Sequence, residues 1–159
     1  QDGRCDVFTT DQSGLYAERL KLPNPDENVV LPEIISKEPL GPVVRQGDDA
    51  WFNVVKWTYF ALLNSEELGV TSANVGEMMT SANPEIQRLL GVKNADGTAA
   101  GFGTGIGLSE EWVAQIIKAV GNYGEIFERN VGLNTPLKIA RGKNALWTAG
   151  GLQYAPPIR

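Results

Sequence analysis

Histidine is absent from this chain of 159 residues, and cysteine occurs once, as Cys5. Without histidine, the chain cannot supply a Ser–His–Asp or Cys–His catalytic set, and it lacks the most common general base near neutral pH. The usual zinc-ligand sets are excluded for the same reason. A single cysteine cannot form a disulfide within the chain. Beside a β-prone segment, Cys5 is more typical of a small buried hydrophobe than of a reactive group.

Long apolar segments and clusters of basic residues are missing as well. The net charge is −5 and no group of Lys and Arg residues stands out, so we expect no nucleic-acid partner. The longest apolar segment, residues 51–63, is interrupted by polar side chains and is too short to span a membrane. No signal peptide is visible and the first residue is Gln1, so we expect a processed, engineered or fragmentary product.

The first twenty residues contain a β-prone run, residues 7–10, which is followed by Asp11 and by a helical pattern over residues 12–22. Ligands of open α/β sheets bind beyond the carboxyl ends of strands. A carboxylate at such an end could hold a cation, for example the ammonium group of an amino acid. Asp is also a favoured helix N-cap residue, and this segment alone favours the capping interpretation of Asp11.

The strongest helical pattern begins after Asp48, a predicted N-cap, and ends at about Leu68, where Gly69 follows. Its many apolar residues leave few polar positions, so we expect a helix that is buried on most sides. Three of its aromatic residues are interpreted as packing residues rather than as platforms for a ligand: Trp51, Trp57 and Tyr59.

Shorter helices are predicted over residues 75–79, 84–90, 110–120 and 123–131. Asn83 should cap the second of these, and Ser109 the third, with Glu110 in its first turn. Between them, residues 97–107 are rich in glycine but do not match the spacing of phosphate-binding fingerprints. We interpret this segment as a flexible or bulged surface loop.

Predicted strands are few and short, at residues 7–10, 29–31, 34–35 and 43–44. A parallel sheet needs several strands with helices on both faces. Most of the predicted helices follow these strands in the chain. The pattern therefore suggests an α/β fold from which part of the sheet is missing.

Three segments carry a resemblance to a known family: residues 2–16 (DGRCDVFTTDQSGLY), residues 37–48 (KEPLGPVVRQGD) and the ending over residues 144–157. They resemble the polar amino-acid-binding proteins of bacterial ABC transporters, most closely the general L-amino-acid-binding branch, over essentially the whole chain. The resemblance implies the C-terminal part of a two-lobe, type II periplasmic-binding-protein fold, helix-rich with few short strands. It places the end of the second lobe at residues 1–28, a crossover or hinge at 29–46, and the C-terminal helical part of the first lobe, with a family-specific extension, at 47–159.

The resemblance also implies a function without catalysis or a cofactor: solute binding in the periplasm for a membrane permease. Asp11 matches the carboxylate that binds the ammonium group of the L-amino acid, and Thr10 lies in the same pocket. Such a charge-assisted hydrogen bond contributes about 1.5–3 kcal/mol. With the strand-end argument, this shifts our interpretation of Asp11 from a cap to a ligand residue. Family members carry a large N-terminal portion that includes other pocket residues and a second cysteine, so we expect weak binding by this chain alone and a free thiol at Cys5.

Two alternatives remain open from the sequence. The first is a dehydratase-like enzyme on the same fold, acting on prephenate-like acids, in which Asp11 would have a shifted pKa. The second is a self-associating fragment with no ligand role. It would pair with a second copy, for example by exchanging elements, or with the missing N-terminal half, because a chain cut from a two-lobe protein exposes sheet edges and apolar patches.

Overall fold

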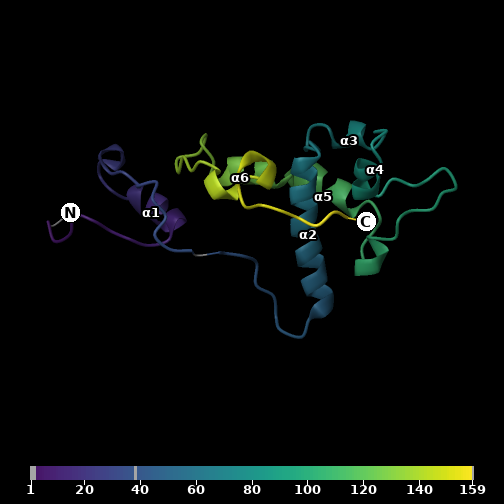
Figure 1. The fold of residues 1–159 in the computed structure, drawn as a ribbon, viewed down its shortest axis with the longest axis horizontal. Coiled ribbons are helices and arrows are strands. Elements are labelled where there is room, and N and C mark those ends of the chain that lie inside the picture. The colour runs from purple at the N-terminus through teal and green to yellow at the C-terminus, as the bar shows by residue number, and fades with distance from the viewer. Residues whose placement is uncertain (1–2, 38, 159) are drawn as a thin grey trace. The chain divides into compact units, whose positions relative to one another are not determined.

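The computed structural model describes residues 3–37 and 39–158. The chain divides into two compact units, Gln1–Gly41 with Glu128–Ala140, and Pro42–Phe127 with Arg141–Arg159. Six α-helices lie in the described residues: α1 (Gln12–Arg19), α2 (Asp49–Glu67), α3 (Val75–Met78), α4 (Pro84–Leu90), α5 (Trp112–Val120) and α6 (Tyr123–Asn130). Short 3₁₀ helices lie at Pro25–Glu27, Thr104–Ile106, Gly142–Asn144 and Trp147–Ala149 (Figure 1). The assignment of residues 1–28, 29–46 and 47–159 to lobes stays a prediction.

Helix α2 is the central element of the larger unit, and its two ends lie where the sequence predicts them. The Asp48 side chain accepts a hydrogen bond from the backbone N–H of Trp51 at 3.0 Å, which confirms the N-cap. At the other end, Gly69 has a φ of +69°, a conformation that favours glycine after a helix.

The main hydrophobic core lies between the second half of α2 and helices α4 and α5, and α5 also contacts α3. Its most deeply buried residues are Ala61, Val70, Leu90, Val113 and Ile117. A second, smaller cluster joins Leu63 of α2 to Leu146 and Ala155 near the C-terminus. The two clusters together fix one half of α2 on several sides.

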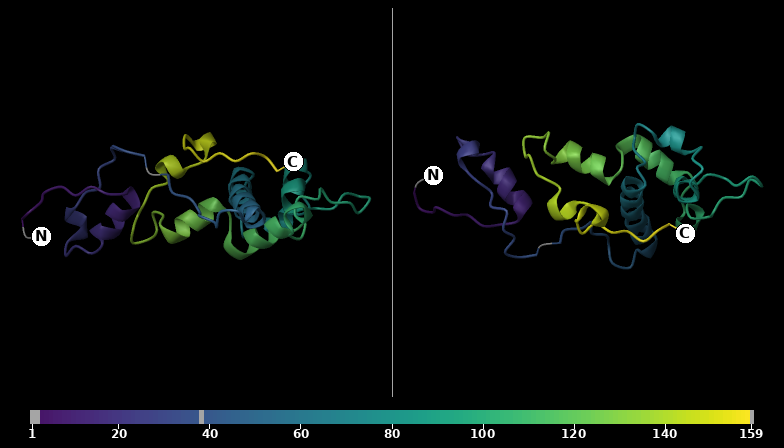
Figure 2. Two further views of the ribbon diagram at one scale, coloured as in Figure 1. Left: turned by 90° about the horizontal axis from the view of Figure 1, so that it is seen from below. Right: turned by 45° about the horizontal axis from the view of Figure 1, so that its top comes forward.

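The first half of α2 is not covered in this way, so the expectation of a helix buried on most sides is wrong for that half. Trp51 is 54% exposed and Phe52 is 47% exposed. The right-hand view of Figure 2 shows α3 and α5 near the upper end of α2, away from its lower turns. Trp57 does pack against the main core, and Tyr59 against the smaller cluster, as predicted. Trp51 was expected to pack too, and it does not.

Helix α4 follows its local signals closely, whereas α5 does not. The Asn83 side chain accepts a hydrogen bond from the N–H of Glu85 at 2.9 Å, and Gly91 closes α4 with a φ of +70°. By contrast, α5 begins only at Trp112, and its N-cap position is Glu111 rather than Ser109. The predicted cap at Ser109 is wrong: Glu110, which was expected in the first turn, lies before the helix, and its carboxylate accepts hydrogen bonds from the loop at Gly101 and Thr104.

Helix α6 begins with a reciprocal pair of hydrogen bonds between Asn122 and Glu125. The N–H of Glu125 donates to the Asn122 side chain at 3.0 Å, and the N–H of Asn122 donates to the Glu125 carboxylate at 2.9 Å. The buried Asn122 amide also donates to the carbonyl of Val70 at 2.8 Å, and the Glu125 carboxylate accepts from Ser72. These bonds tie the start of α6 to the segment that follows α2.

None of the predicted strands forms within residues 3–37 and 39–158, where the one β-interaction is an isolated bridge between Leu146 and Gln153. Val7 is 82% exposed and Val43 is 95% exposed. A strand is stabilised by hydrogen bonds to a neighbour, and the amides of residues 5–9, 29–37 and 39–44 donate no backbone hydrogen bond to another described residue. The sequence therefore carries strand propensity for which this part of the chain offers no partner.

The smaller unit has almost no core of its own. Between residues 3 and 37, no residue is buried, and Cys5 is exposed. The expectation that Cys5 acts as a buried hydrophobe is therefore wrong, because the described residues next to it are exposed as well and do not pack over its side chain. Helix α1 ends at Arg19, three residues earlier than predicted, since tight turns at Lys21 and Leu22 lead into Pro23.

Candidate functional site

Asp11 occupies the N-cap position of α1, but it does not act as a hydrogen-bonding cap. Its backbone has φ −51° and ψ 141°, and its side chain accepts no capping hydrogen bond. The side chain is exposed. By contrast, Asp48 and Asn83, at the N-caps of α2 and α4, each accept one. The interpretation of Asp11 as a hydrogen-bonding cap is therefore wrong. Its carboxylate lies at the N-terminal end of α1, where the helix dipole is positive.

Thr10 lies directly beside Asp11 at the first turn of α1. A Cβ built on Gly14 would lie 3.3 Å from the Thr10 methyl group, 3.8 Å from its hydroxyl oxygen and 4.0 Å from the Cβ of Asp11. The side chains of Thr10 and Asp11 thus both lie next to Gly14, which has no side chain to cover them. Both side chains are exposed, so the described residues of this unit do not enclose a ligand around them.

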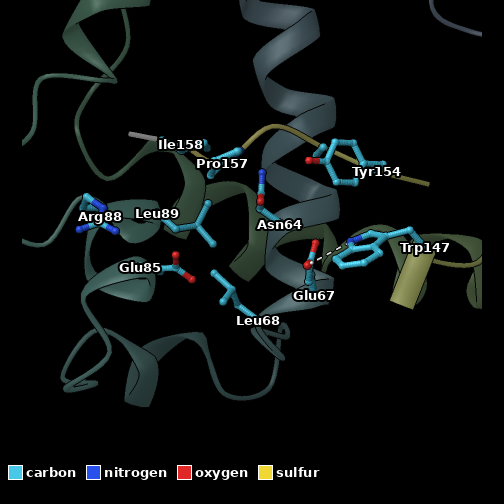
Figure 3. Close-up of a pocket in the computed structure, with 11 residues that line it drawn as sticks. Asn64, Glu67, Leu68, Glu85, Arg88, Leu89, Trp147, Tyr154, Pro157 and Ile158 are labelled. Carbon is cyan, nitrogen blue, oxygen red and sulfur yellow. Dashed lines mark hydrogen bonds between the residues drawn. The ribbon is translucent and has the colours of Figure 1, made fainter. Parts of the chain in front are cut away.

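The larger unit contains a groove that the sequence did not predict. It has a volume of about 200 Å³ and is lined by residues of α2, α4 and the C-terminal segment. Trp147 and Tyr154 lie at one end, and Glu85 and Arg88 lie at the other (Figure 3). The Trp147 indole donates a hydrogen bond to Glu67 at 3.2 Å. No local signal could have found this groove, because its walls come from segments far apart in the chain.

The C-terminal segment that forms one wall of the groove is held by polar contacts to α2. The Asn64 amide donates to the carbonyl of Pro156 at 3.0 Å, and the Tyr59 hydroxyl donates to the side chain of Gln153. Burial raises the pKa of Tyr59 above its usual value, with a smaller contribution from Tyr123 nearby. These contacts suit a structural role for the groove wall.

An ion pair forms a second tie between the C-terminal segment and α2. Arg141 donates two hydrogen bonds to the Glu66 carboxylate, at 2.9 and 3.1 Å. Its guanidinium also lies 5.2 Å from the ring centres of both Tyr123 and Phe127 in α6. Both charged side chains are 19% exposed. The ion pair is thus mostly shielded from solvent and holds three segments together. Neither charged side chain is available to bind a ligand.

The glycine-rich segment, residues 97–107, binds the carboxylate of Glu110, a side chain of the same protein. The carboxylate of Glu110 accepts hydrogen bonds from the N–H of Gly101 at 3.0 Å, and from the N–H and hydroxyl of Thr104, each at 2.9 Å. The backbone N–H of Thr104, and then its hydroxyl, lower the pKa of Glu110. A phosphate group would have to displace this carboxylate, which supports the interpretation as a surface loop.

The described residues offer neither a metal site nor a membrane-spanning helix. In residues 3–37 and 39–158, no group of three or more His, Cys, Asp or Glu side chains is arranged to hold a metal ion. Nor does any helix of the described chain combine the length and the apolar character needed to cross a membrane. The candidate sites are therefore Thr10 and Asp11 in the smaller unit and the groove in the larger unit.

Comparison with solved structures identifies the class of fold. The chain has a TM-score of 0.90 and 62% sequence identity to an ABC transporter periplasmic binding protein from Brucella ovis with glutathione bound, covering 99% of this chain and 48% of that chain. The fold is therefore the C-terminal part of a periplasmic-binding-protein fold, helix-rich and nearly without strands, as the resemblance implied. No family model matches the chain.

Comparison with curated proteins then identifies the branch. The chain is 65% identical over 157 residues to the general L-amino acid-binding periplasmic protein AapJ of Rhizobium johnstonii, covering 99% of this chain and 45% of AapJ. It is 52% identical over 158 residues to the glutamate/glutamine/aspartate/asparagine-binding protein BztA of Rhodobacter capsulatus, again covering 45% of the relative. The chain is thus homologous to a C-terminal portion of amino-acid-binding periplasmic proteins of ABC transporters, and it spans about half their length.

The comparisons also decide between the predicted classes of activity. These relatives are named as binding proteins, not as enzymes. The names of these relatives agree with the prediction of a binding protein and include no dehydratase. The roles of Asp11 and Thr10 are not tested by them and stay predictions.

Proposed function

We propose that this chain forms part of the solute-binding protein of an ABC transporter for L-amino acids. In this function, the complete protein binds its ligand in the periplasm and presents it to a membrane permease. The observation that carries the proposal is the 62% identity and TM-score of 0.90 to a periplasmic binding protein along 99% of this chain.

Asp11 is proposed to accept hydrogen bonds from the α-ammonium group of the amino acid, beside the hydroxyl of Thr10. Two structural features support this role: the Asp11 side chain accepts no capping hydrogen bond, and the Thr10 side chain lies over the same turn of α1. The positive end of α1 would repel an ammonium group, so an anionic side chain is needed there to make the site attractive to a cation. Binding requires no cofactor.

The rest of the pocket is proposed to lie in the part of the relatives that this chain does not match. The described residues between 3 and 37 bury no side chain, so they supply a carboxylate but no enclosure. Pockets for small ligands usually cover most of the ligand surface. We therefore expect this chain alone to bind amino acids weakly or not at all.

Calorimetry of a full-length protein tests the proposal. The chain would be joined to the amino-terminal part of AapJ and titrated with L-glutamate, L-glutamine, L-asparagine and glutathione, as the names of the relatives suggest. Loss of one charge-assisted hydrogen bond in Asp11→Ala should weaken binding about tenfold or more. Asp6→Ala removes an exposed acidic residue of the same segment and should leave the affinity within about twofold. An unchanged affinity in Asp11→Ala would refute the ammonium role.

A further inference from the structure

The groove of the larger unit contains an arginine whose hydrogen-bonding capacity the described chain does not use. The Nε atom of Arg88 is buried and has no hydrogen-bond partner. Glu85 lies three residues earlier on α4, a spacing that often allows pairing, yet the ion pairs of the described residues join other side chains. The last turn of α4 favours a cation, but this does not explain a buried donor without an acceptor. An anionic group from outside the described chain would satisfy this guanidinium.

The opposite end of the groove is formed by two aromatic side chains in a fixed arrangement (Figure 3). The rings of Trp147 and Tyr154 have centres 5.9 Å apart and planes inclined by 76°, an edge-to-face pair. The backbone N–H of Trp147 donates to the carbonyl of Gln153 at 2.9 Å, and its indole donates to Glu67. Since the two side chains are still 51% and 65% exposed, their rings are open to contact with a ligand.

The groove between these two ends is short. Leu68 and Leu89 line it between the charged end and the aromatic end in the view of Figure 3. Its volume of about 200 Å³ is below the range of about 300–1,000 Å³ that is usual for pockets of drug-sized ligands. The groove therefore suits an occupant of about the size of one amino acid, with a charged end and an apolar end.

We propose that this groove is a second ligand site, in a different unit from Asp11, for a small zwitterion with an aromatic side chain, such as an aromatic amino acid. The ligand carboxylate pairs with the terminal nitrogens of the Arg88 guanidinium, because its Nε is buried. The ligand ammonium group lies next to the exposed carboxylate of Glu85. The ligand ring packs against Trp147 and Tyr154.

The charges of the lining favour a zwitterion over a simple anion or a simple cation. Two carboxylates and one guanidinium line the groove, and one of the carboxylates, Glu67, already accepts the hydrogen bond of the Trp147 indole. A ligand without an ammonium group would place its carboxylate near the like charge of Glu85, and a ligand without a carboxylate would leave Arg88 unpaired. This site goes beyond the proposed function, because it lies in the larger unit and needs neither Thr10 nor Asp11.

Nuclear magnetic resonance of the Trp147 indole tests the site. The protein is the chain joined to the amino-terminal part of AapJ, it carries Asp11→Ala to weaken the first site, and the probe is L-phenylalanine. Trp147→Phe identifies the indole N–H signal of Trp147. Because the groove is open, we expect L-phenylalanine to shift that signal with a Kd of about 0.1–1 mM, and this chain alone should give the same shift. Arg88→Ala should weaken binding about tenfold or more.

Matched variants and ligand analogues separate the individual contacts. Lys118→Ala removes a cation from the last turn of α5, outside the groove, and should change the affinity less than about twofold. Glu85→Gln should weaken L-phenylalanine about two- to fivefold, but it should not weaken 3-phenylpropionate, which has no ammonium group. 2-Phenylethylamine has no carboxylate, so it should bind about tenfold more weakly than L-phenylalanine and should not respond to Arg88→Ala.

Three results would overturn the proposal. The first is no shift of the Trp147 signal at about 10 mM L-phenylalanine, and the second is a shift with the same concentration dependence in Arg88→Ala. The third is a shift in this chain alone that the joined protein does not show, because the amino-terminal part would then cover the groove. All three are independent of the ligand role of Asp11, because Asp11→Ala is present throughout.

Discussion

Removal of Arg141 tests how the C-terminal segment is held on the larger unit. The guanidinium makes two hydrogen bonds to Glu66, at 2.9 and 3.1 Å, and lies 5.2 Å from the ring centres of Tyr123 and Phe127. With each charged side chain 19% exposed, the pair lies between an exposed pair, which contributes about 0–1 kcal/mol, and a buried pair, which costs about 3–5 kcal/mol to break. Adding the contacts with the rings, we expect Arg141→Ala to lower the free energy of unfolding by about 2–4 kcal/mol.

Urea unfolding followed by far-ultraviolet circular dichroism measures this change. Arg141→Lys keeps the charge but loses the two-pronged hydrogen bonding, so it should be less destabilising than Arg141→Ala. In a double-mutant cycle with Glu66→Ala, the coupling energy between the two side chains should reach about 1–3 kcal/mol. A loss below about 0.5 kcal/mol for Arg141→Ala, or a coupling energy near zero, would refute the reasoning, because the pair would then behave as an exposed one.

The remaining predictions concern the loop and the smaller unit. Since hydrogen bonds lower the pKa of Glu110 in the folded state from its usual 4.5, their stabilisation is present above that value and is lost as the pH falls through the lowered pKa. The amide NMR signals of Gly101 and Thr104 should therefore shift in acid below pH 4.5, and a pH-independent position, or the same titration in Glu110→Gln, would contradict this. Because no residue from 3 to 37 is buried, the amides of 5–9 should exchange with solvent at nearly unprotected rates in this chain alone, while the amide of the buried Ile117 should be protected. Comparable protection of both would contradict it.

The features that could be predicted from sequence are those that local residues determine. Asp48, Asn83 and Gly91 act as expected because a cap needs only its own helix and the first or last turn. The same locality explains why the ends of α2 and α4 could be located to within a residue or so. In these segments the propensity and the tertiary structure agree, so no distant contact changes the outcome.

The features that could not be predicted depend on partners far away in the chain, or outside it. Glu110 leaves the expected first turn of a helix because the amides of Gly101 and Thr104 bind its carboxylate more favourably than a helix end would. Arg141 meets Glu66 across 75 residues, which no spacing rule describes. The strand propensity of residues 29–31 and 43–44 is real, but a strand is a property of a pair.

Asp11 is a position where the local capping rule fails, and the proposed ligand role offers a reason for this. Asp occupies the N-cap position of both α1 and α2, and Asp48 accepts the expected hydrogen bond whereas Asp11 does not. A cap hydrogen bond contributes about 1 kcal/mol, so an Asp that forgoes it leaves α1 less stable than its sequence allows. Departures from local consistency are expected at sites whose side chains are kept available for a ligand. The carboxylate of Asp11 is therefore more informative than a well-made cap would be, because Asp is a favoured capping residue and Asp11 still makes no capping hydrogen bond.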